Sequence, residues 1–190
     1  MKQTPAPLLV ALAGPNGAGK TTFHHSHLKP LGLRFVNADV LAAELGLGAY
    51  EAAALADVVR RELLRRRESF VFETVFSDPS GGKLAFLKEA VEAGYEVVLC
   101  FIGLASAALS EQRVALRVSQ GGHDVPDAKL RSRFPRTLRN LKAALPVCSQ
   151  VRIYDNSDLR HPYRELVVLE RGRVIRRSTP LPPWLKPLLG

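Results

Sequence analysis

The sequence predicts an α/β fold with a mainly parallel sheet of five strands, followed by a hairpin. Three observations support this. Short apolar runs rich in Val, Leu, Ile and Phe alternate with longer segments of helical periodicity, as they do when helices connect parallel strands. The first run leads directly into a glycine-rich loop. The conspicuous acidic residues lie where such runs end, and ligands of parallel sheets bind at the carboxyl ends of the strands.

The first two predicted strands are "PLLVALAG", which runs into the glycine-rich loop, and "LRFVNAD", which ends at Asp39. Between them a helix is expected to start at Gly19 or Lys20. From 40 to 67 the pattern is again helical, with a break near "GLGAY". Its apolar residues recur every four positions, and we expect Arg60 and the other arginines of the segment to lie off that apolar face.

The middle of the chain contains two more strands, "SFVFETVF" and "YEVVLCFIGL". The second is the most apolar run and is expected at the centre of the sheet. The segments "SGGKLAFLKEAVEAG" and "SAALSEQRVALRVSQ" have helical periodicity and end at glycines. Pro126 fits the first turn of a further helix. Pro135 is expected to kink or split that helix, because proline removes a hydrogen bond from a helix interior.

The last part of the chain begins with a fifth strand, "VRIYDNS", and continues with "ELVVLERGRVIRR", a hairpin that turns at Arg171 and Gly172. The proline-rich tail "STPLPPWLKPLLG" is expected to lie on the surface as irregular chain. The sequence contains no repeat and no long linker, so we expect one domain over 1–190. Within it we expect a lid at roughly 113–140, and the hairpin and tail at roughly 160–190.

The composition limits the function. Hydrophobic residues make up 46% of the 190 residues, which is typical of globular proteins. No apolar run approaches the ~18 residues that span a membrane. Cys100 and Cys148 lie in apolar sequence, which predicts reduced thiols and a cytoplasmic location. The net charge of +9 comes mainly from arginine, and it indicates either nucleic-acid binding or a site that handles several phosphates.

The glycine-rich loop "GPNGAGKTT" contains the pattern G-x-x-x-x-G-K-[ST] from Gly14 to Thr21. Glycines let the backbone wrap phosphate oxygens, and the loop N–H groups and the following helix N-terminus point at the anion. Lys20 is expected to reach the β- and γ-phosphates, and the Thr21 hydroxyl is expected to hold Mg²⁺. The loop therefore predicts ATP or GTP binding by Gly14, Pro15, Asn16, Gly17, Ala18, Gly19, Lys20, Thr21 and Thr22.

The sequence also indicates which group receives the phosphoryl group. Hydrolytic motors carry an acid at the end of a second apolar strand, and "VVLCFIGLAS" has none. Asp39 and Glu73 instead lie at predicted strand ends, where a carboxylate can orient and deprotonate an attacking hydroxyl. This pattern favours a small-molecule kinase. A helix N-cap at Asp39 and a turn-capping acid at Glu73 are the structural alternatives.

Arginines are concentrated between Arg113 and Arg139, beside a glycine pair and the proline-containing helix. We interpret this segment as a hinged lid whose arginines cover the transferring phosphoryl group and exclude water. A solvated basic helix is the alternative. His123 and Asp124, in "GGHDVP", either cap the lid helix or contact nucleotide. The run "HHSH" at 24–27 has no acid or cysteine beside it and does not predict a metal site.

Several of these segments together resemble the zeta toxin family of P-loop kinases, in its compact branch known as "predicted ABC-type ATPase". The segments are "GPNGAGKTT", "FVNADVLA", "FETVFS", "RVSQGGHDVP", "RSRFPRTLRNL" and "VRIYDNS", in the family's order over roughly 8–157. The resemblance implies a three-layer P-loop NTPase sandwich like that of nucleoside monophosphate kinases. It also implies ATP, Mg²⁺ and transfer to a sugar hydroxyl, because the better-known toxins phosphorylate UDP-N-acetylglucosamine.

The resemblance assigns roles by position. Asp39 matches the catalytic base, and Glu73 and Thr74 match a strand end that binds the substrate. The catalytic residues expected on this basis are Lys20, Asp39, Arg117 and Arg133.

The two arginines of that set belong to the lid. Arg117 matches the family's first lid arginine, and we take Arg133 as the second. Arg131 and Arg136 are rivals for the second position, because the spacing through Pro135 is not fixed.

The acceptor stays open, since the chain is shorter than the classical toxins. A sugar nucleotide is the acceptor that the resemblance implies. A nucleoside, an RNA end or another hydroxyl compound is the alternative, and a nucleic-acid-stimulated ATPase is a further one. The partners that we expect are a small-molecule acceptor and, through the resemblance to toxins, an antitoxin protein. Nucleic acid and membrane are not expected partners.

Overall fold

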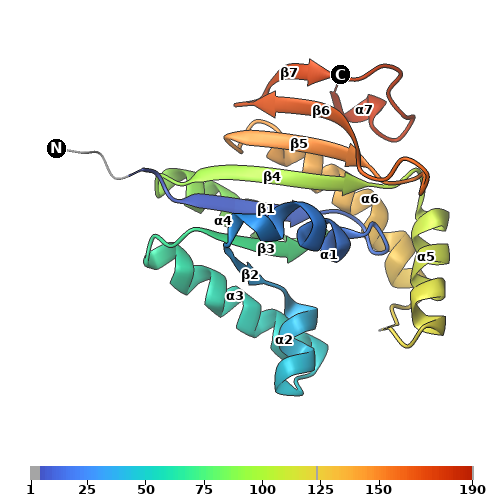
Figure 1. Cartoon of the computed structure of the whole chain (residues 1–190), viewed down its shortest axis with the longest axis horizontal. Coiled ribbons are helices and arrows are strands. Elements are labelled where there is room, and N and C mark those ends of the chain that lie inside the picture. The colour runs from blue at the N-terminus through green and yellow to red at the C-terminus, as the bar shows by residue number, and fades with distance from the viewer. Residues whose placement is uncertain (1–4, 123, 190) are drawn as a thin grey trace.

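The computed structural model describes residues 5–122 and 124–189, and its core is one mixed sheet in the order β2-β3-β1-β4-β5-β6-β7 (Figure 1). The pairs among the first five strands of this order are parallel, and β6 and β7 continue the sheet as an antiparallel hairpin. The predicted parallel sheet and hairpin are therefore confirmed. The strands are β1 (Leu8–Ala13), β2 (Arg34–Val36), β3 (Phe70–Thr74), β4 (Glu96–Gly103), β5 (Gln150–Asp155), β6 (Arg164–Glu170) and β7 (Arg173–Arg177).

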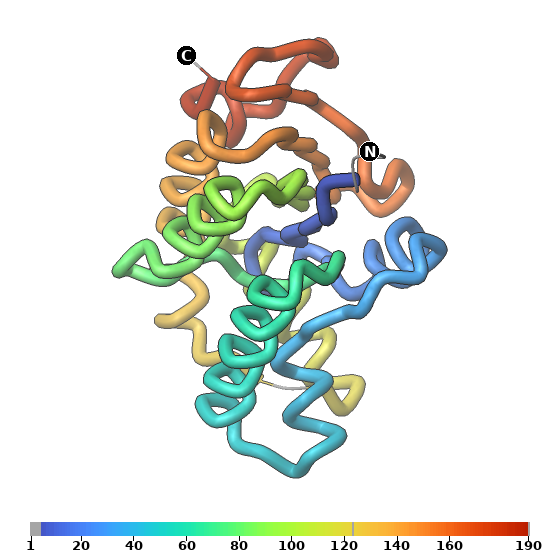
Figure 2. The backbone as a smooth tube through the Cα atoms, turned by 90° about the vertical axis from the view of Figure 1, so that its left-hand side faces the viewer, coloured from blue at the N-terminus to red at the C-terminus, as the bar shows by residue number. Residues whose placement is uncertain are grey.

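Helices cover both faces of the sheet, which gives three layers (Figures 1 and 2). The first helix packs on one face, and α4 and α6 pack on the other. The pair α2–α3 extends the β2 side of the sheet, and α5 stands at the carboxyl ends of the parallel strands (Figure 1). The helices are α1 (Lys20–Phe23), continued by the π-helical turn η1 (His24–Leu28) and the 3-10 turn η2 (Lys29–Leu31), then α2 (Ala38–Leu45), α3 (Ala49–Arg65), α4 (Gly82–Glu92), α5 (Ala107–Ser119), α6 (Asp127–Ala144) and α7 (Lys186–Leu189).

The apolar runs of β1 and β4 form the centre of the sheet, as predicted. β1 pairs with β3 on one side and with β4 on the other. Side chains on both faces of β1 are buried, because helices lie over both faces. Within the described residues, no helix is long and apolar enough to cross a membrane. Cys100 and Cys148 are free and buried, and burial raises the pKa of each thiol to about 12.

The second strand is shorter than predicted. β2 ends at Val36, and Asn37 turns the chain into α2. The side-chain oxygen of Asn37 accepts hydrogen bonds from the backbone N–H groups of Asp39 (2.8 Å) and Val40 (3.4 Å). Asn37 is therefore the N-cap, and α2 begins at Ala38. The prediction that Asp39 ends the strand is wrong, and so is its alternative as an N-cap, because Asp39 lies in the first turn of the helix.

Arg60 lies on the buried face of α3, which corrects the prediction that it faces solvent. Only 5% of Arg60 is exposed. The buried face of α3 includes Ala52 and Ala56, whose small side chains leave room for a long one on the next turn. The guanidinium group lies over the rings of Phe72 (5.0 Å to the centroid) and Phe86 (5.8 Å). The aliphatic stem and these cation–π contacts allow an arginine to occupy a position in an apolar face.

The helix that contains Pro135 is not split. α6 runs as one element from Asp127 to Ala144. Two side chains after the proline fix it to the segment that follows β3. The Thr137 hydroxyl donates to the carbonyl oxygen of Val75 (2.9 Å), and the Asn140 amide donates to that of Phe76 (3.0 Å). These tertiary contacts offset the hydrogen bond that proline removes.

The tail is part of the core, although we predicted irregular chain on the surface. Leu181, Trp184 and Leu185 are buried, and the chain ends in the short helix α7. The Trp184 ring lies 6.2 Å from that of Phe101, centroid to centroid, and directly over Gly103 at the end of β4. An aromatic side chain at this point covers apolar surface of the central strand that α6 leaves open.

The second strand of the hairpin, β7, forms one edge of the sheet. β7 pairs with β6 on one side, and all five of its residues are exposed. Three of the five are arginines, Arg173, Arg176 and Arg177, and Arg176 forms an ion pair with Glu165 on β6. The edge strand therefore presents charge together with its unpaired backbone groups.

Replacing Gly103 by Ala should lower the free energy of unfolding by roughly 1–3 kcal/mol, the usual effect of overpacking a core, because the added methyl group overlaps the Trp184 ring. Trp184→Leu makes space there, so the double variant should lose less stability than the sum of the single variants. Urea unfolding of the wild type and the three variants measures this coupling. Additive effects would contradict the contact.

Candidate active site

The glycine-rich loop joins β1 to α1 in a conformation that requires glycine at two key points. Gly14 has φ 148°, and a Cβ atom there would collide with the carbonyl oxygen of Ile102 on β4. Gly19 has φ 83° and precedes the first residue of α1. The loop can thus pass close to the neighbouring strand and turn sharply into the helix, which directs backbone N–H groups and the helix N-terminus into the space above.

The carbonyl groups of the loop are held by donors from several elements. Asn156, after β5, donates its side-chain amide to the carbonyl oxygen of Ala18 (2.9 Å), and the Tyr163 hydroxyl donates to that of Gly19 (2.9 Å). The Ser110 hydroxyl on α5 donates to the carbonyl oxygen of Asn16 (2.7 Å). These contacts hold the loop from the segments that follow β4 and β5. No feature of the sequence had assigned Asn156 or Tyr163 to the site beyond their place near the end of a strand.

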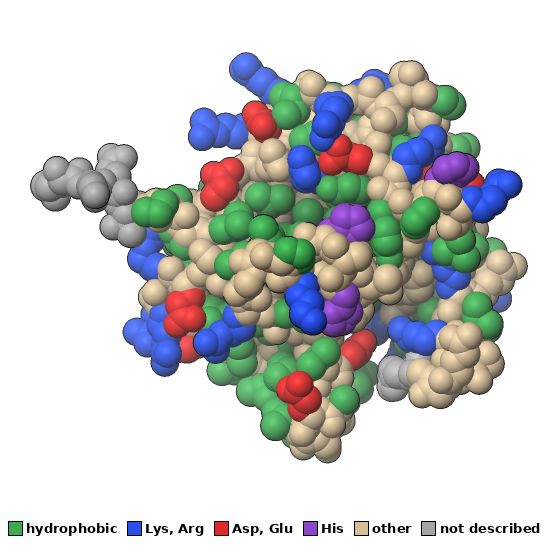
Figure 3. Space-filling view, viewed as in Figure 1, with side chains coloured by type: hydrophobic (Ala, Val, Ile, Leu, Met, Phe, Trp, Pro, Cys, Tyr) green, Lys and Arg blue, Asp and Glu red, His purple; other side chains and the backbone are tan. Residues whose placement is uncertain are grey.

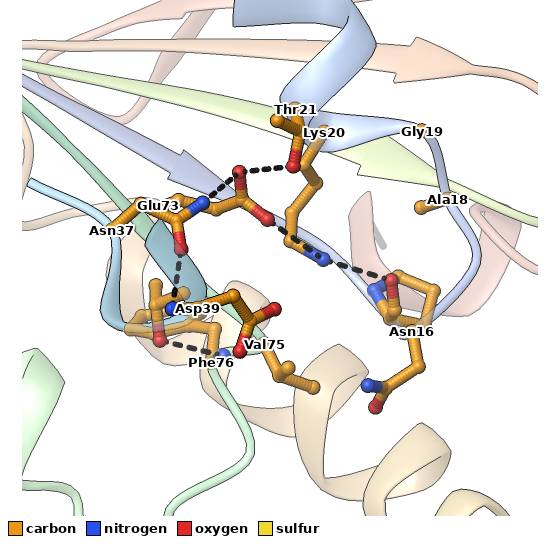
Figure 4. A network of polar contacts seen from close by, with 12 residues as sticks. Asn16, Ala18, Gly19, Lys20, Thr21, Asn37, Asp39, Glu73, Val75 and Phe76 are labelled. Atoms are coloured by element: carbon orange, nitrogen blue, oxygen red, sulfur yellow. Dashed lines mark hydrogen bonds and ion pairs between the residues drawn. The ribbon is translucent and has the colours of Figure 1, made fainter. Parts of the chain in front are cut away.

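Glu73 is the centre of the polar network beside the loop (Figure 4). Its Oε2 accepts hydrogen bonds from the hydroxyl of Thr21 (2.9 Å) and the side-chain amide of Asn37 (2.9 Å). Its Oε1 lies 3.8 Å from Nζ of Lys20. Only 12% of the Glu73 side chain is exposed. The sheet register explains this position, because Glu73 on β3 is the parallel neighbour of Leu12 on β1, just before the loop.

This geometry changes the interpretation of the acids. An acid next to the loop was sought on "VVLCFIGLAS", which contains β4 from Val97 onward, and the carboxyl end of β4 has none. However, β1 has a second neighbour, β3, and Glu73 lies near its end. A carboxylate that contacts the loop Thr hydroxyl is placed to hold Mg²⁺ together with that hydroxyl. Glu73 therefore faces the nucleotide side of the site as well as the substrate side that was predicted.

Lys20, Asp39 and Arg117 surround the same space. The Asp39 carboxylate and the Lys20 amino group point into the gap between the end of β3 and the loop (Figure 4). Burial lowers the pKa of Lys20, the charges of Glu73 and Asp39 raise it, and the charge of Arg117 lowers it further. These effects require the four groups to lie near one another. In the described structure Nζ of Lys20 donates to the carbonyl oxygen of Pro15 (3.1 Å). A bound phosphate would be a stronger acceptor for this amino group than the carbonyl oxygen.

A cavity of about 470 Å³ opens beside Asp39, between α2, α3, the segment after β3 and α6. We call it the acceptor cavity. Glu73 and Thr74, which we expected to bind the substrate, are among the residues that line it, and the Thr74 hydroxyl accepts from the backbone N–H of Phe76 (3.0 Å). A charged group, Asp39, thus lies at the boundary between the nucleotide loop and a cavity large enough for a small molecule.

The lid arginines divide into two groups. Arg133 and Arg136 on α6 both line the acceptor cavity. Arg131 instead donates from Nε to the carboxylate of Glu111 on α5 (2.9 Å), where it joins the two helices. Of the three candidates for the second lid position, Arg133 and its rival Arg136 line the cavity, and Arg131 does not. Asp124 is exposed between α5 and α6, and His123 lies outside the described residues.

The histidines after the loop stack on aromatic rings. His24 is 5% exposed and lies face to face with Phe35, with 3.6 Å between ring centroids. His27 stacks on Phe23 (4.4 Å). Neither ring nitrogen of His24 has a hydrogen-bond partner among the described residues. Burial, with the nearby charges of His25 and Lys29, lowers the pKa of His24.

A family model described as "AAA domain" matches residues 9–134, which is more than half of the chain and includes the loop, Asp39, Glu73 and the lid segment as far as 134. The chain belongs to the AAA domain family. No curated protein sequence matches this AAA domain.

Solved structures resemble this AAA domain in fold. A structure of the AvrRxo1-ORF1:-ORF2 complex with ATP matches with a TM-score of 0.67 and 21% identity, over 88% of this chain and 60% of that one. The PezAT chromosomal toxin–antitoxin system of Streptococcus pneumoniae matches with a TM-score of 0.61 and 19% identity, over 86% and 72%. The Pnkp1/Rnl/Hen1 RNA repair complex matches with a TM-score of 0.59 and 14% identity, over 94% and 52%.

These matches confirm the predicted P-loop fold, and the toxin–antitoxin structure among them agrees with the resemblance to zeta toxins. The AAA domain spans 60% of the AvrRxo1 chain that it matches.

Replacing Asn37 by Asp separates its two contacts. Aspartate still offers an oxygen that caps α2, but it replaces the amide donor to Glu73 by a second carboxylate oxygen. The repulsion between the two acids should weaken MgATP binding roughly tenfold or more, the loss expected for a hydrogen bond to a charged group. Calorimetric titration with MgATP measures the change. Asn37→Ser caps the helix without adding charge, so its MgATP affinity should lie between those of wild type and Asn37→Asp. Equal affinity in wild type and Asn37→Asp would contradict the network.

The lowered pKa of His24 predicts that stability falls in mild acid. The unfolded chain takes up a proton near the ordinary histidine pKa of about 6.5, whereas the buried ring resists it to lower pH. The free energy of unfolding should therefore decrease as pH falls below about 6.5 and stop decreasing below the lowered pKa. Urea unfolding at pH 7.5, 6.5 and 5.5 tests this. His24→Phe retains the stack without a titrating group and should reduce the pH dependence; an unchanged dependence would contradict the assignment.

Proposed function

We propose that this AAA domain is an ATP-dependent kinase that transfers the γ-phosphoryl group to a hydroxyl of a small molecule, a sugar nucleotide such as UDP-N-acetylglucosamine. One observation carries the proposal. Glu73 is the carboxylate that contacts Thr21 beside the loop. Asp39 is therefore a second carboxylate, and it lies between Lys20 and the acceptor cavity. A site that uses only water as acceptor needs no cavity of about 470 Å³ beside its second acid.

The loop side of the site holds the nucleotide. Lys20 and the loop N–H groups bind the β- and γ-phosphates, whose negative charge adds to that of Glu73 beside the buried ammonium group. Thr21 and Glu73 present a hydroxyl and a carboxylate oxygen within one hydrogen bond of each other, and these are oxygen ligands of the kind that Mg²⁺ prefers. When bound, Mg²⁺ supplies positive charge to the phosphates.

The acceptor side carries out the transfer. Asp39 accepts the proton of the acceptor hydroxyl as its oxygen forms a bond to the γ-phosphorus. The bond between that phosphorus and the β–γ bridging oxygen breaks, and ADP leaves with the electron pair. Arg117 and Arg133 offset the negative charge that spreads over the transferring group. Arg136 is the alternative to Arg133, because both line the acceptor cavity.

The comparisons support this proposal at the level of the fold. The AvrRxo1 complex was solved with ATP, and the PezAT system pairs a toxin with an antitoxin. We extend both features to this AAA domain as part of the proposal: ATP as the phosphoryl donor, and an antitoxin protein as a partner.

A kinase for a nucleoside or an RNA end is the alternative, favoured by the fold likeness to the RNA repair complex. A nucleic-acid-stimulated ATPase is less well supported. On the described surface in Figure 3, Lys and Arg side chains alternate with Asp and Glu side chains and do not form one continuous basic band. Nucleic-acid binding draws on such a band, because affinity depends on neutralising successive phosphates.

The first experiment is phosphoryl transfer from γ-labelled ATP with Mg²⁺ to a panel of UDP-N-acetylglucosamine, nucleosides and oligonucleotides. Asp39→Asn should reduce the transfer rate roughly 10²- to 10⁴-fold, the usual contribution of a general base, and Lys20→Ala should abolish it. Glu44→Gln removes an exposed acid from the same helix as Asp39 and should leave the rate unchanged. Full transfer by Asp39→Asn, or label only on inorganic phosphate with every acceptor, would contradict the proposal.

A further inference from the structure

A second, smaller cavity adjoins the acceptor cavity. Its volume is about 220 Å³, and it lies between α3 and the start of α4. Four charged residues line both cavities, so they form the wall that the two cavities share: Asp57, Arg60, Asp78 and Lys83. We call this wall and the smaller cavity the distal pocket. An acceptor that starts at Asp39 and fills the acceptor cavity therefore ends against charged side chains.

Arg60 is the buried charge of the distal pocket. Its side chain is held by the rings of Phe72 and Phe86, and it forms an ion pair with Asp57 one turn earlier on α3. A guanidinium group has five N–H donors, and burying it is costly unless they are matched by acceptors. Asp57 does not serve Arg60 alone, because it also accepts a hydrogen bond from Nζ of Lys83 (2.7 Å).

Lys83 brings a second positive charge from α4. It lies in the first turn of that helix, where its backbone N–H donates to Asp78 (3.1 Å). The helix N-cap is Gly81, which contributes no side-chain acceptor, so the partial positive charge of the helix end adds to the charge of Lys83. Two cations and a helix N-terminus thus converge on one small polar cavity.

Both cations of the distal pocket are buried, and burial disfavours their charged forms. Burial, with the charges of Arg60 and Arg61, lowers the pKa of Lys83 to about 8, although Asp78 acts in the opposite direction. Burial and Arg61 lower the pKa of Arg60 to about 10. An anion in the distal pocket would stabilise both charged forms.

We propose that the distal pocket binds a phosphate or diphosphate group of the acceptor, at the end of the molecule remote from the hydroxyl that faces Asp39. This rests on the proposed function and narrows it to phosphorylated acceptors. Arg60 presents a planar fork of donors that matches two phosphate oxygens, and Lys83 adds a point charge. A free nucleoside or a free sugar leaves these donors without a ligand and binds more weakly.

Binding can be tested without knowing the acceptor. Inorganic pyrophosphate is titrated by calorimetry into protein saturated with MgADP, so that the glycine-rich loop is already occupied. Wild type should bind it, and Arg60→Gln and Lys83→Gln should each weaken binding roughly tenfold or more, as expected for a lost hydrogen bond to a charged group. Arg66→Gln removes an exposed arginine at the end of α3, outside the pocket, and should have no effect.

One further variant and an unfolding measurement guard against a purely structural effect. Arg60→Lys keeps the positive charge without the planar fork, so it should retain the fold while binding pyrophosphate more weakly than wild type. Urea unfolding of every variant shows whether the fold is intact. Pyrophosphate affinity that is absent in wild type, or equal in wild type and folded Arg60→Lys and Lys83→Gln, would overturn the proposal and leave the cluster as an ion network that joins α3 to α4.

The source of the phosphate and the link to catalysis are tested separately. Competition with uridine diphosphate and with glucose 1-phosphate distinguishes a nucleotide-linked acceptor from a sugar phosphate, and displacement by either supports the pocket. With any acceptor that is phosphorylated in the assay above, Lys83→Gln should raise KM roughly tenfold or more with kcat little changed. Pyrophosphate binding that depends on Arg60 while no acceptor is phosphorylated would refute the kinase and retain the anion site. Transfer with a wild-type KM in Lys83→Gln would refute the anion site and retain the kinase.

Discussion

The site depends on one partly buried carboxylate, Glu73. A negative charge beside Lys20 compensates an ammonium group that burial would otherwise neutralise. The same carboxylate holds the Thr21 hydroxyl and the Asn37 amide. It therefore links β3 to the segments that follow β1 and β2, and it does so at the point where the sheet order places β3 beside β1. Packing alone brings these segments close; the hydrogen bonds of Glu73 fix their side chains to one another.

Asn37 extends this link toward the acceptor. One end of its amide contacts Glu73, and the other caps the helix that carries Asp39. A bound cation and nucleotide would change the charge around Glu73. Asn37 would transmit that change to the first turn of α2. The lid is constrained in a similar way. Thr137 and Asn140 anchor the later half of α6 beside the acceptor cavity, so closure of a lid would involve α5 and the beginning of α6 more than the whole of α6.

Much of this arrangement could be predicted from the sequence, because strong local signals produced it. The apolar runs of β1 and β4, the glycine spacing of the loop and the turn at Arg171 and Gly172 each act over a few residues. Periodicity failed for Arg60, because two alanines on the same face look like weak apolar positions and a buried arginine looks like a solvated one. Strand order decided the role of Glu73, and a sequence does not state which strand lies beside the loop. Trp184 in a proline-rich tail had no local signal of burial, since its partner Gly103 is 81 residues away.

The arginines of β7 contribute to the positive net charge for a reason other than phosphate binding. A sheet whose last strand is exposed offers its backbone to any other extended chain, and hydrophobic edge strands lead to aggregation. Val174 and Ile175 on β7 are exposed apolar residues of this kind, but Arg173, Arg176 and Arg177 flank them. Two copies that approach edge to edge would bring these positive charges together. Part of the net charge of +9 therefore opposes edge-to-edge pairing of two copies, independently of any phosphate that the rest of the molecule binds.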